Sequence, residues 1–177
     1  MSTLKVGTIQ DHTNSNTAIT IDSAGRIKTP QTPLFIAYRM SNYTLDTSYS
    51  ELIYDQEDVD IGGNYDISNG RFTAPIDGLY EFAVASIDSA HASCVRQQIR
   101  INGVITGSSG GGNYEHRKDH TGMGSAAGYS TNSEYCAYIN LTAGQYVSVF
   151  HKIDSGSLTA YGNGNYRYNY FRGKLII

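Results

Sequence analysis

The feature that most constrains the fold of this 177-residue chain is the alternation of apolar and polar residues in short runs. In "CVRQQIRINGV" (94–104), Val95, Ile99 and Ile101 fall on one face of an extended chain, and polar residues fill the other. Runs of the same kind cover residues 34–40, 50–55, 70–75, 78–87, 134–141, 145–153 and 166–177. No window shows helical spacing over three turns. Many short strands separated by Gly, Asn and Ser turns predict an all-β sandwich or jelly roll.

The composition of the chain favours strands and interfaces over a helical enzyme scaffold. Charged residues make up 16% of it, whereas Tyr (15) and Gly (19) are abundant. A net charge of −3 and a pI near 5.9 argue against nucleic-acid binding, which requires a basic patch. There is no apolar run of about 18 residues, so we expect no membrane insertion. The N-terminus lacks the apolar region of a secretory signal, which predicts synthesis in a cytoplasm.

Residues 1–33 are predicted to form an attachment segment separate from a head at 34–177. "LKVGTIQ" and "AITIDSAGRIKT" are short alternating runs, and "DSAG" predicts a hairpin turn between two of the strands. An isolated hairpin is marginally stable in water, so we expect this segment to dock on another surface. Pro30 and Pro33 mark the boundary, because proline stiffens an extended link.

Three stretches of the head resemble the C1q/tumour-necrosis-factor-like family. "GRFTAPIDGLYEFAV" resembles the family's F-T-x-P-x-x-G-x-Y-x-F signature, and "FRGKLI" resembles its closing F-x-G-x-L. "LTAGQYVSV" resembles the L-x-x-G-D-x-V element, with Gln145 in place of Asp. The resemblance implies a ten-stranded jelly roll that assembles as a homotrimer about a three-fold axis, with a binding or structural role and no catalysis. The positions predicted to form the family-motif core are Phe72, Pro75, Gly78, Phe82, Leu141, Gly144, Val147, Phe171, Gly173 and Leu175.

The N-terminal "LKVGTIQ…NTAITIDSAGRI" resembles the leader on fibre and other structural proteins of marine tailed bacteriophages. Together with the missing secretory signal, it predicts a homotrimeric virion protein made in a host cytoplasm. This would be a tail- or head-fibre component that attaches to other virion proteins through the N-terminal segment. Its C1q-like knob would recognise a host-surface glycan. A purely architectural capsid decoration (cement) protein is an alternative, as is a cellular C1q-like lectin or ligand module.

No enzyme motif is present: the sequence lacks G-x-S-x-G, H-E-x-x-H, C-x-x-C and the phosphate-binding G-x-x-x-x-G-K-[ST]. We therefore predict no catalytic residues. The acidic run at 55–60 offers oxygen ligands for a structural calcium ion, but it lacks EF-hand spacing, and a solvated loop is favoured. His116, Asp119 and His120 could gather around a trimer axis as a metal site, although an exposed polar loop is favoured.

Tyrosines are the most informative residue class. We predict that Tyr80, Tyr168 and Tyr170 contribute to the trimer interface, where tyrosine is enriched. A second group of residues is predicted to contact a glycan: Tyr114, Tyr129, Tyr161, Asn163, Asn165 and Tyr166. The alternative is that these tyrosines pack at subunit interfaces.

The closing run "YRYNYFRGKLII" carries large side chains on both faces of an extended chain. Phe171, Gly173, Leu175 and Ile177 should point into the sandwich, with Gly173 leaving room for a neighbouring ring. Tyr170, with Tyr168 on the same parity, should face away from that core.

Cys94 and Cys136 are too few for a disulfide framework. Free thiols are favoured, and a single bridge between them is the alternative.

Overall fold

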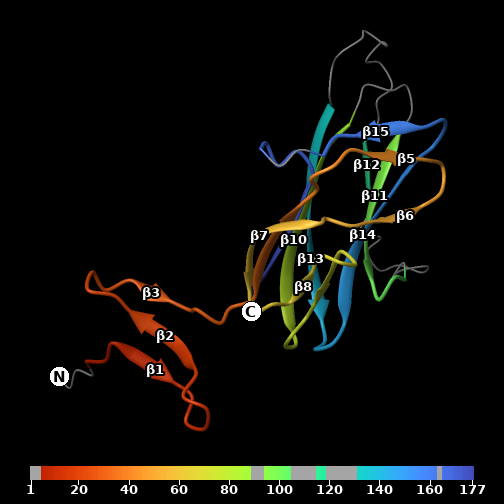
Figure 1. The fold of residues 1–177 in the computed structure, drawn as a ribbon. Coiled ribbons are helices and arrows are strands. Elements are labelled where there is room, and N and C mark those ends of the chain that lie inside the picture. Colours follow the sequence, from red (N-terminus) through yellow and green to blue (C-terminus); the bar gives the residue numbers. More distant parts are fainter. Residues whose placement is uncertain (1–4, 89–93, 105–114, 119–130, 163–164) are drawn as a thin grey trace.

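The computed structural model describes residues 5–88, 94–104, 115–118, 131–162 and 165–177. These residues form strands and turns without a helix, which confirms the predicted all-β class. Accordingly, no helix among them could cross a membrane. Within the described part of the chain the strands form a small N-terminal sheet and two larger sheets that pack as a sandwich (Figure 1).

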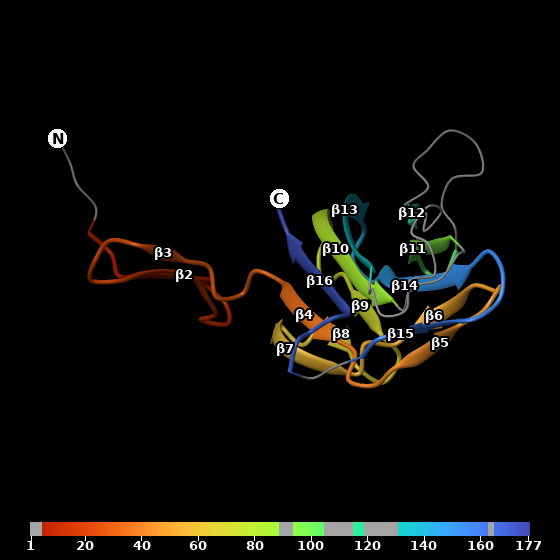
Figure 2. The same cartoon turned by 90° about the horizontal axis from the view of Figure 1, so that it is seen from above.

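The N-terminal sheet consists of β1 (Thr8–Gln10), β2 (Thr17–Ile21) and β3 (Ile27–Lys28), all antiparallel. The predicted hairpin at "DSAG" is confirmed. Asp22 Oδ1 accepts hydrogen bonds from the backbone N–H groups of Ala24 and Arg26, and Gly25 supplies the positive φ (79°) that the turn requires. In two perpendicular views this sheet stands apart from the sandwich, joined to it by a short link (Figures 1 and 2).

The larger sheet of the sandwich, here called the large sheet, has the strand order β5-β15-β10-β16-β4-β7 in the described chain, with β13 also paired to β10. Its strands are β4 (Leu34–Tyr38), β5 (Tyr43–Leu45), β7 (Gln56–Ile61), β10 (Gly78–Asp88), β13 (Thr131–Leu141), β15 (Leu158–Ala160) and β16 (Tyr170–Leu175). Strand β10 is its centre, because it pairs with β13 along its whole length and with β16 from Tyr80 to Ala85.

The opposite sheet, here called the small sheet, has the order β12-β11-β14-β9-β8, with β6 paired to β14. Its described strands are β6 (Ser50–Leu52), β8 (Tyr65–Asp66), β9 (Arg71–Thr73), β11 (Val95–Ile101), β12 (Glu115–Lys118) and β14 (Tyr146–Ile153). The predicted alternation of β11 is confirmed, because Val95 and Ile99 are buried between the sheets and Arg96 and Arg100 are only half-buried.

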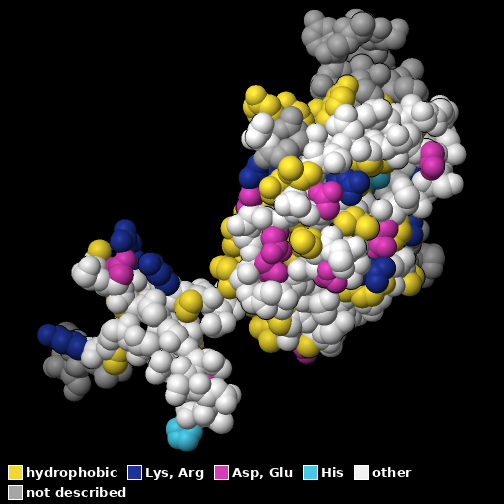
Figure 3. Space-filling model, viewed as in Figure 1, with side chains coloured by type: hydrophobic (Ala, Val, Ile, Leu, Met, Phe, Trp, Pro, Cys, Tyr) yellow, Lys and Arg dark blue, Asp and Glu magenta, His cyan; other side chains and the backbone are white. Residues whose placement is uncertain are grey.

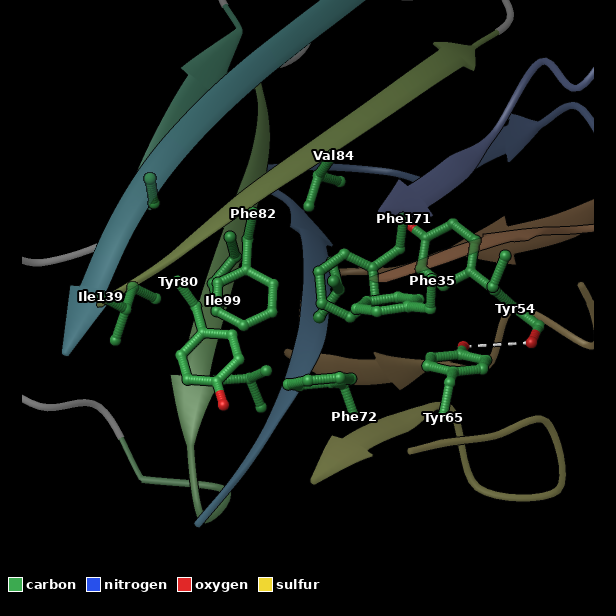
Figure 4. Packing of buried hydrophobic residues seen from close by; sticks show 14 of the residues in the cluster. Phe35, Tyr54, Tyr65, Phe72, Tyr80, Phe82, Val84, Ile99, Ile139 and Phe171 are labelled. Carbon is green, nitrogen blue, oxygen red and sulfur yellow. Dashed lines mark hydrogen bonds between the residues drawn. The ribbon is translucent and has the colours of Figure 1, made fainter. Parts of the chain in front are cut away.

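Aromatic rings from both sheets meet in the core (Figure 4). The ring of Phe35 stacks on Tyr65 (centroids 4.8 Å apart) and on Phe72 (4.9 Å). The edge-on ring of Phe171 is 4.9 Å from Phe35, and Phe82 stacks against Phe171 at 5.7 Å. Such ring pairs add directional packing to the area they bury, so this cluster fixes how the two sheets face each other.

A layer of buried polar side chains divides the core into two apolar clusters. Along β14, His151 lies between Val149 of the aromatic cluster and Ile153 of a second cluster, and Gln97 occupies the equivalent place on β11. Gln97 Nε2 donates a 2.6 Å hydrogen bond to Ser86 Oγ. Full burial lowers the pKa of His151 to about 3, so its imidazole is neutral in the folded protein.

The closing strand agrees with its predicted facing in part. Phe171 and Gly173 are buried and Leu175 is half-buried against the core. A Cβ at Gly173 would lie 2.6 Å from the rings of Phe35 and Phe82, so this glycine does make room for its neighbours. Two predictions are wrong. Ile177 is 81% exposed, and the strand begins at Tyr170, so the tyrosines before it belong to a turn.

The family-motif positions prove to be of two kinds. The side chains that pack in or against the core are those of Phe72, Phe82, Leu141, Val147, Phe171 and Leu175, and Gly173 is a buried backbone position beside the rings of Phe35 and Phe82. Pro75 and Gly144 are instead exposed and Gly78 is half-buried, so these three motif positions lie outside the buried core. They shape two adjoining turns. The Gly144 N–H donates to the Ala74 carbonyl (2.8 Å), and Gly144 has a φ of 85°.

The family pattern has Asp where this chain has Gln145, and the structure shows how glutamine serves there. Its Oε1 accepts a 2.8 Å hydrogen bond from the Thr142 N–H and so closes its own turn. The neighbouring Ala143 N–H donates to Asp77 Oδ1 of the facing turn (2.7 Å). The departure from the motif therefore preserves the turn that the motif encodes.

The acidic run at 55–60, for which a solvated loop was favoured, forms most of β7. Val59 pairs with Ile36 and Ile61 with Leu34 at the edge of the large sheet. Both Val59 and Ile61 are half-buried, whereas Glu57 and Asp58 are exposed. A strand at the edge of a sheet needs only one face buried against the protein. Charged residues at its remaining positions therefore do not prevent it from pairing.

Candidate assembly and recognition surfaces

The outward side of the large sheet presents the most coherent described surface of the head. Inward-facing side chains on β10, β13 and β16 alternate with outward-facing ones, and the pairing registers align the latter in rows. One such row runs from Cys136 through Ala83 and Arg172 to Ile36. We define the outer face as Leu34, Ile36, Glu81, Ala83, Ala85, Glu134, Cys136, Tyr138, Tyr170, Arg172 and Lys174.

The centre of the outer face is made of small side chains. Ala83 and Ala85 point outward but are only 1% and 3% exposed, because longer neighbours lean over them. Between those neighbours lies a shallow hollow of about 80 Å³, with Leu34, Ala83 and Arg172 among its lining residues. A low centre with higher margins can receive a side chain from an apposed surface.

Charges on the outer face cancel in pairs. Arg172 Nη2 lies 3.0 Å from Glu134 Oε1, and Lys174 Nζ lies 3.5 Å from Glu81 Oε2. Such exposed pairs contribute little to the stability of the subunit. Their effect is to leave a face without net charge among its defined residues, so a second copy of the same face would not be repelled.

Two tyrosines add to the apolar area of the outer face. Tyr138 is 59% exposed. Tyr170 is half-buried, and burial together with a hydrogen bond to the Glu134 carboxylate raises its pKa to about 12. The prediction that Tyr170 faces away from the core is confirmed by the burial pattern of β16.

The other two tyrosines predicted at the trimer interface are placed differently. Tyr80 is fully buried, with its ring 5.6 Å from Phe72 and its hydroxyl donating to the Ile76 carbonyl (2.8 Å). It has no surface left to offer a second subunit, so its assignment to the interface is corrected to the core. Tyr168 lies in the turn before β16, outside the outer face.

That turn, residues 165–168, displays aromatic rings and is here called the tyrosine turn. Tyr166 and Tyr168 stack with centroids 5.3 Å apart and planes 10° from parallel, and Tyr166 is 67% exposed. Arg167 adopts a φ of 51°, and its Nε and Nη2 donate hydrogen bonds to Asp58 Oδ2 and Oδ1, each at 2.8 Å. Its guanidinium also lies 4.0 Å from the centre of the Tyr38 ring. The contacts of Arg167 therefore hold the turn against β4 and β7.

Among the other predicted recognition residues, Asn165 is exposed and Tyr161 is half-buried. Asn169 Nδ2 donates to the Tyr161 carbonyl, which ties Tyr161 to the end of the tyrosine turn. Tyr114, Tyr129 and Asn163 lie outside the described residues.

In the acidic run at 55–60, three of the candidate ion ligands have other partners: Asp55, Asp58 and Asp60, of which Asp58 is paired with Arg167. Asp60 accepts hydrogen bonds from the N–H groups of Asn64 and Tyr65, and Asp55 accepts one from the Met40 N–H. Within the described ranges no group of three or more His, Cys, Asp or Glu side chains could hold a metal ion. Asp119, His120 and the side chain of His116 lie outside those ranges.

Neither cysteine forms a disulfide, as favoured from the sequence. Cys94 is buried near the second apolar cluster, whereas Cys136 is exposed on the outer face.

Comparison with known proteins shows where this architecture recurs. The family model for the C1q domain matches residues 34–123. The globular domain of zebrafish complement 1qA superposes with a TM-score of 0.57 at 16% identity, over 82% of this chain and 98% of that one. Eiger TNF from S. frugiperda gives 0.59 at 8% identity, over 83% and 94%. Murine APRIL gives 0.57 at 8% identity, over 82% and 99%. No curated protein sequence matched the chain.

Proposed function

The chain belongs to the C1q domain family, and from this premise we propose that it is a homotrimeric structural protein of a bacteriophage virion. Its place would be in a tail or head fibre, with the sandwich as the knob. The knob would hold three chains together and contact a host-surface glycan. Residues 1–33 would attach the fibre to the particle.

The observation that carries the trimer is the outer face of the large sheet. It combines covered alanines at its centre, an exposed Tyr138 and charge pairs that cancel on the face itself. Depletion of unpaired charge at the centre and enrichment in tyrosine are the features that distinguish interface cores from other surfaces. A three-fold assembly that buries this face also agrees with the family resemblance.

Two features support the fibre role. The N-terminal segment resembles phage leader sequences, and it forms a sheet that stands apart from the head. The tyrosine turn supports glycan recognition, because an exposed ring such as Tyr166, with Asn165 beside it, offers stacking and amide hydrogen bonds to a sugar.

Light scattering at micromolar concentration tests the trimer. The expected mass is three times that of the 19.3 kDa chain. Tyr138→Asp places a charge on the outer face and should shift the mass toward that of one chain, because an unpaired buried charge is strongly unfavourable. Ile67→Asp is the matched control: Ile67 is 42% exposed in the turn between β8 and β9, away from the outer face. A wild-type chain that is monomeric removes the central claim.

Mass spectrometry and antibody labelling of purified particles test the location. A fibre component should be present in few copies and labelled on tail or head projections. A copy number that follows the capsid lattice would favour the decoration protein, and absence from particles would refute the virion role.

A further inference from the structure

The N-terminal sheet is amphipathic across its strands. The pairing registers set Ile9 opposite Ile19 on β1 and β2, and Ile21 opposite Ile27 on β2 and β3. Because residues paired across antiparallel strands share a face, and Ile19 and Ile21 are two apart on one strand, these side chains all lie on one side. We call it the isoleucine face: Ile9, Ile19, Ile21 and Ile27.

Nothing in the sheet itself covers the isoleucine face. No residue from 5 to 32 is buried, and Ile9, Ile21 and Ile27 are 46%, 36% and 68% exposed. Apolar side chains lie open on this part of the protein in Figure 3. A sheet this small without a covered face is not stable alone in water, so the face requires an occupant.

The charged residues of β3 and of the turn before it are kept off the isoleucine face. Lys28 pairs with Thr20, which places both on the opposite side of the sheet. Asp22 and Arg26 neutralise each other in the hairpin turn at 2.7 Å. An uncharged, single-residue-type surface is complementary to further copies of itself and offers little that would select a different partner.

The exit of the segment from the head fixes where its copies meet. Pro33 is buried and its carbonyl accepts a hydrogen bond from the Leu175 N–H (3.0 Å), which anchors the chain beside β16. The next residue, Leu34, belongs to the outer face. Residues 29–32 can span at most about 14 Å when extended, so three segments leaving a trimer remain near its axis.

Resting on the proposed trimer, we infer that the isoleucine face is covered by the isoleucine faces of two further copies of this chain. The three sheets form a three-sided stalk below the knob. Their polar sides, with Thr20 and Lys28, then point outward and are the surfaces available for attachment to the particle.

Cross-linking tests the arrangement in the full-length chain. In a Cys136→Ser background, Ile27→Cys leaves one accessible thiol per chain and should give covalent dimers with a short bis-maleimide on a denaturing gel. Lys28→Cys, one residue away on the polar side, is the matched control and should give only the background of the parent. Equal cross-linking by the two variants, or none by Ile27→Cys in a trimeric chain, overturns the inference.

Amide hydrogen exchange provides a second readout. Residues 17–21 should be protected in the wild type, lose that protection in Ile27→Asp and keep it in Lys28→Asp, while the melting of the head is unchanged in both. A trimer whose residues 17–21 exchange freely overturns the stalk and leaves the proposed function standing. A chain that is monomeric by light scattering removes the proposed function, and the stalk with it.

Discussion

Gly173 offers the sharpest test of how the closing strand packs. An added Cβ would lie 2.6 Å from Phe35 Cε1 and equally close to two atoms of the Phe82 ring. Neither ring can move away freely, because Phe35 is itself stacked on Tyr65 and Phe72. Overpacking of a close-packed core typically costs about 1–3 kcal/mol. Replacing glycine in a strand returns about 0.5–1 kcal/mol of backbone entropy. Because three ring atoms lie this close, the cost is near the upper end of its range, and Gly173→Ala should lower the free energy of unfolding by about 2 kcal/mol.

Urea unfolding at one fixed protomer concentration measures this difference, since the stability of an oligomer depends on concentration. Gly7→Ala is the control, because nothing lies within 4 Å of a Cβ at that position. It should leave the unfolding of the head unchanged. A Gly173→Ala protein as stable as the wild type would refute the packing of Phe35 and Phe82 onto this glycine.

Three further predictions concern the core and the outer face. Phe171→Ala removes a ring that is 0% exposed and should cost about 3–5 kcal/mol of unfolding free energy by urea titration; a loss below about 1 kcal/mol would contradict its place in the aromatic cluster. Tyr170→Asp should instead lower the thermal melting temperature of the trimer, and an unchanged value would mean that Tyr170 faces something other than a subunit. For His151, the unfolded chain takes up a proton below a pKa of about 6.5, whereas the folded chain does so only near a pKa of about 3. The free energy of unfolding should therefore fall by about 2 kcal/mol between pH 7 and pH 5. His151→Gln should make this decrease smaller. Equal urea midpoints of the wild type at the two pH values would refute the burial of a neutral imidazole.

The strands that could be predicted are those whose apolar alternation is long and uninterrupted. Strand β10 is the clearest case, since Tyr80, Phe82 and Val84 are all fully buried on one side. The two-residue period of a strand also predicted correctly that Phe171 faces the core and that Tyr170 faces the opposite side. In each case one face of the strand packs on the core, so the apolar residues of the sequence pattern are the ones that folding buries.

Features that depend on partners distant in sequence could not be predicted. The acidic run of β7 forms a strand because Val59 meets Ile36 of β4, which no local pattern reveals. The tyrosine turn ends the apparent alternation of the closing run because Arg167 turns back to reach Asp58. Tyr80 was assigned to an interface on residue type alone, and its burial follows from Phe72 on the opposite sheet.

The polar layer of Ser86, Gln97 and His151 has a consequence for how the sandwich tolerates change. Close-packed apolar cores transmit the strain of a substitution to their neighbours, whereas a hydrogen-bonded layer between two cores interrupts that contact. The smaller cluster, which includes Leu45, Ile153 and Leu158, nevertheless meets the aromatic cluster at Tyr43, whose ring packs against both. A substitution at this end of the domain can therefore reach the aromatic rings by way of Tyr43, so the substitutions tolerated there should be those that leave the packing of Tyr43 intact.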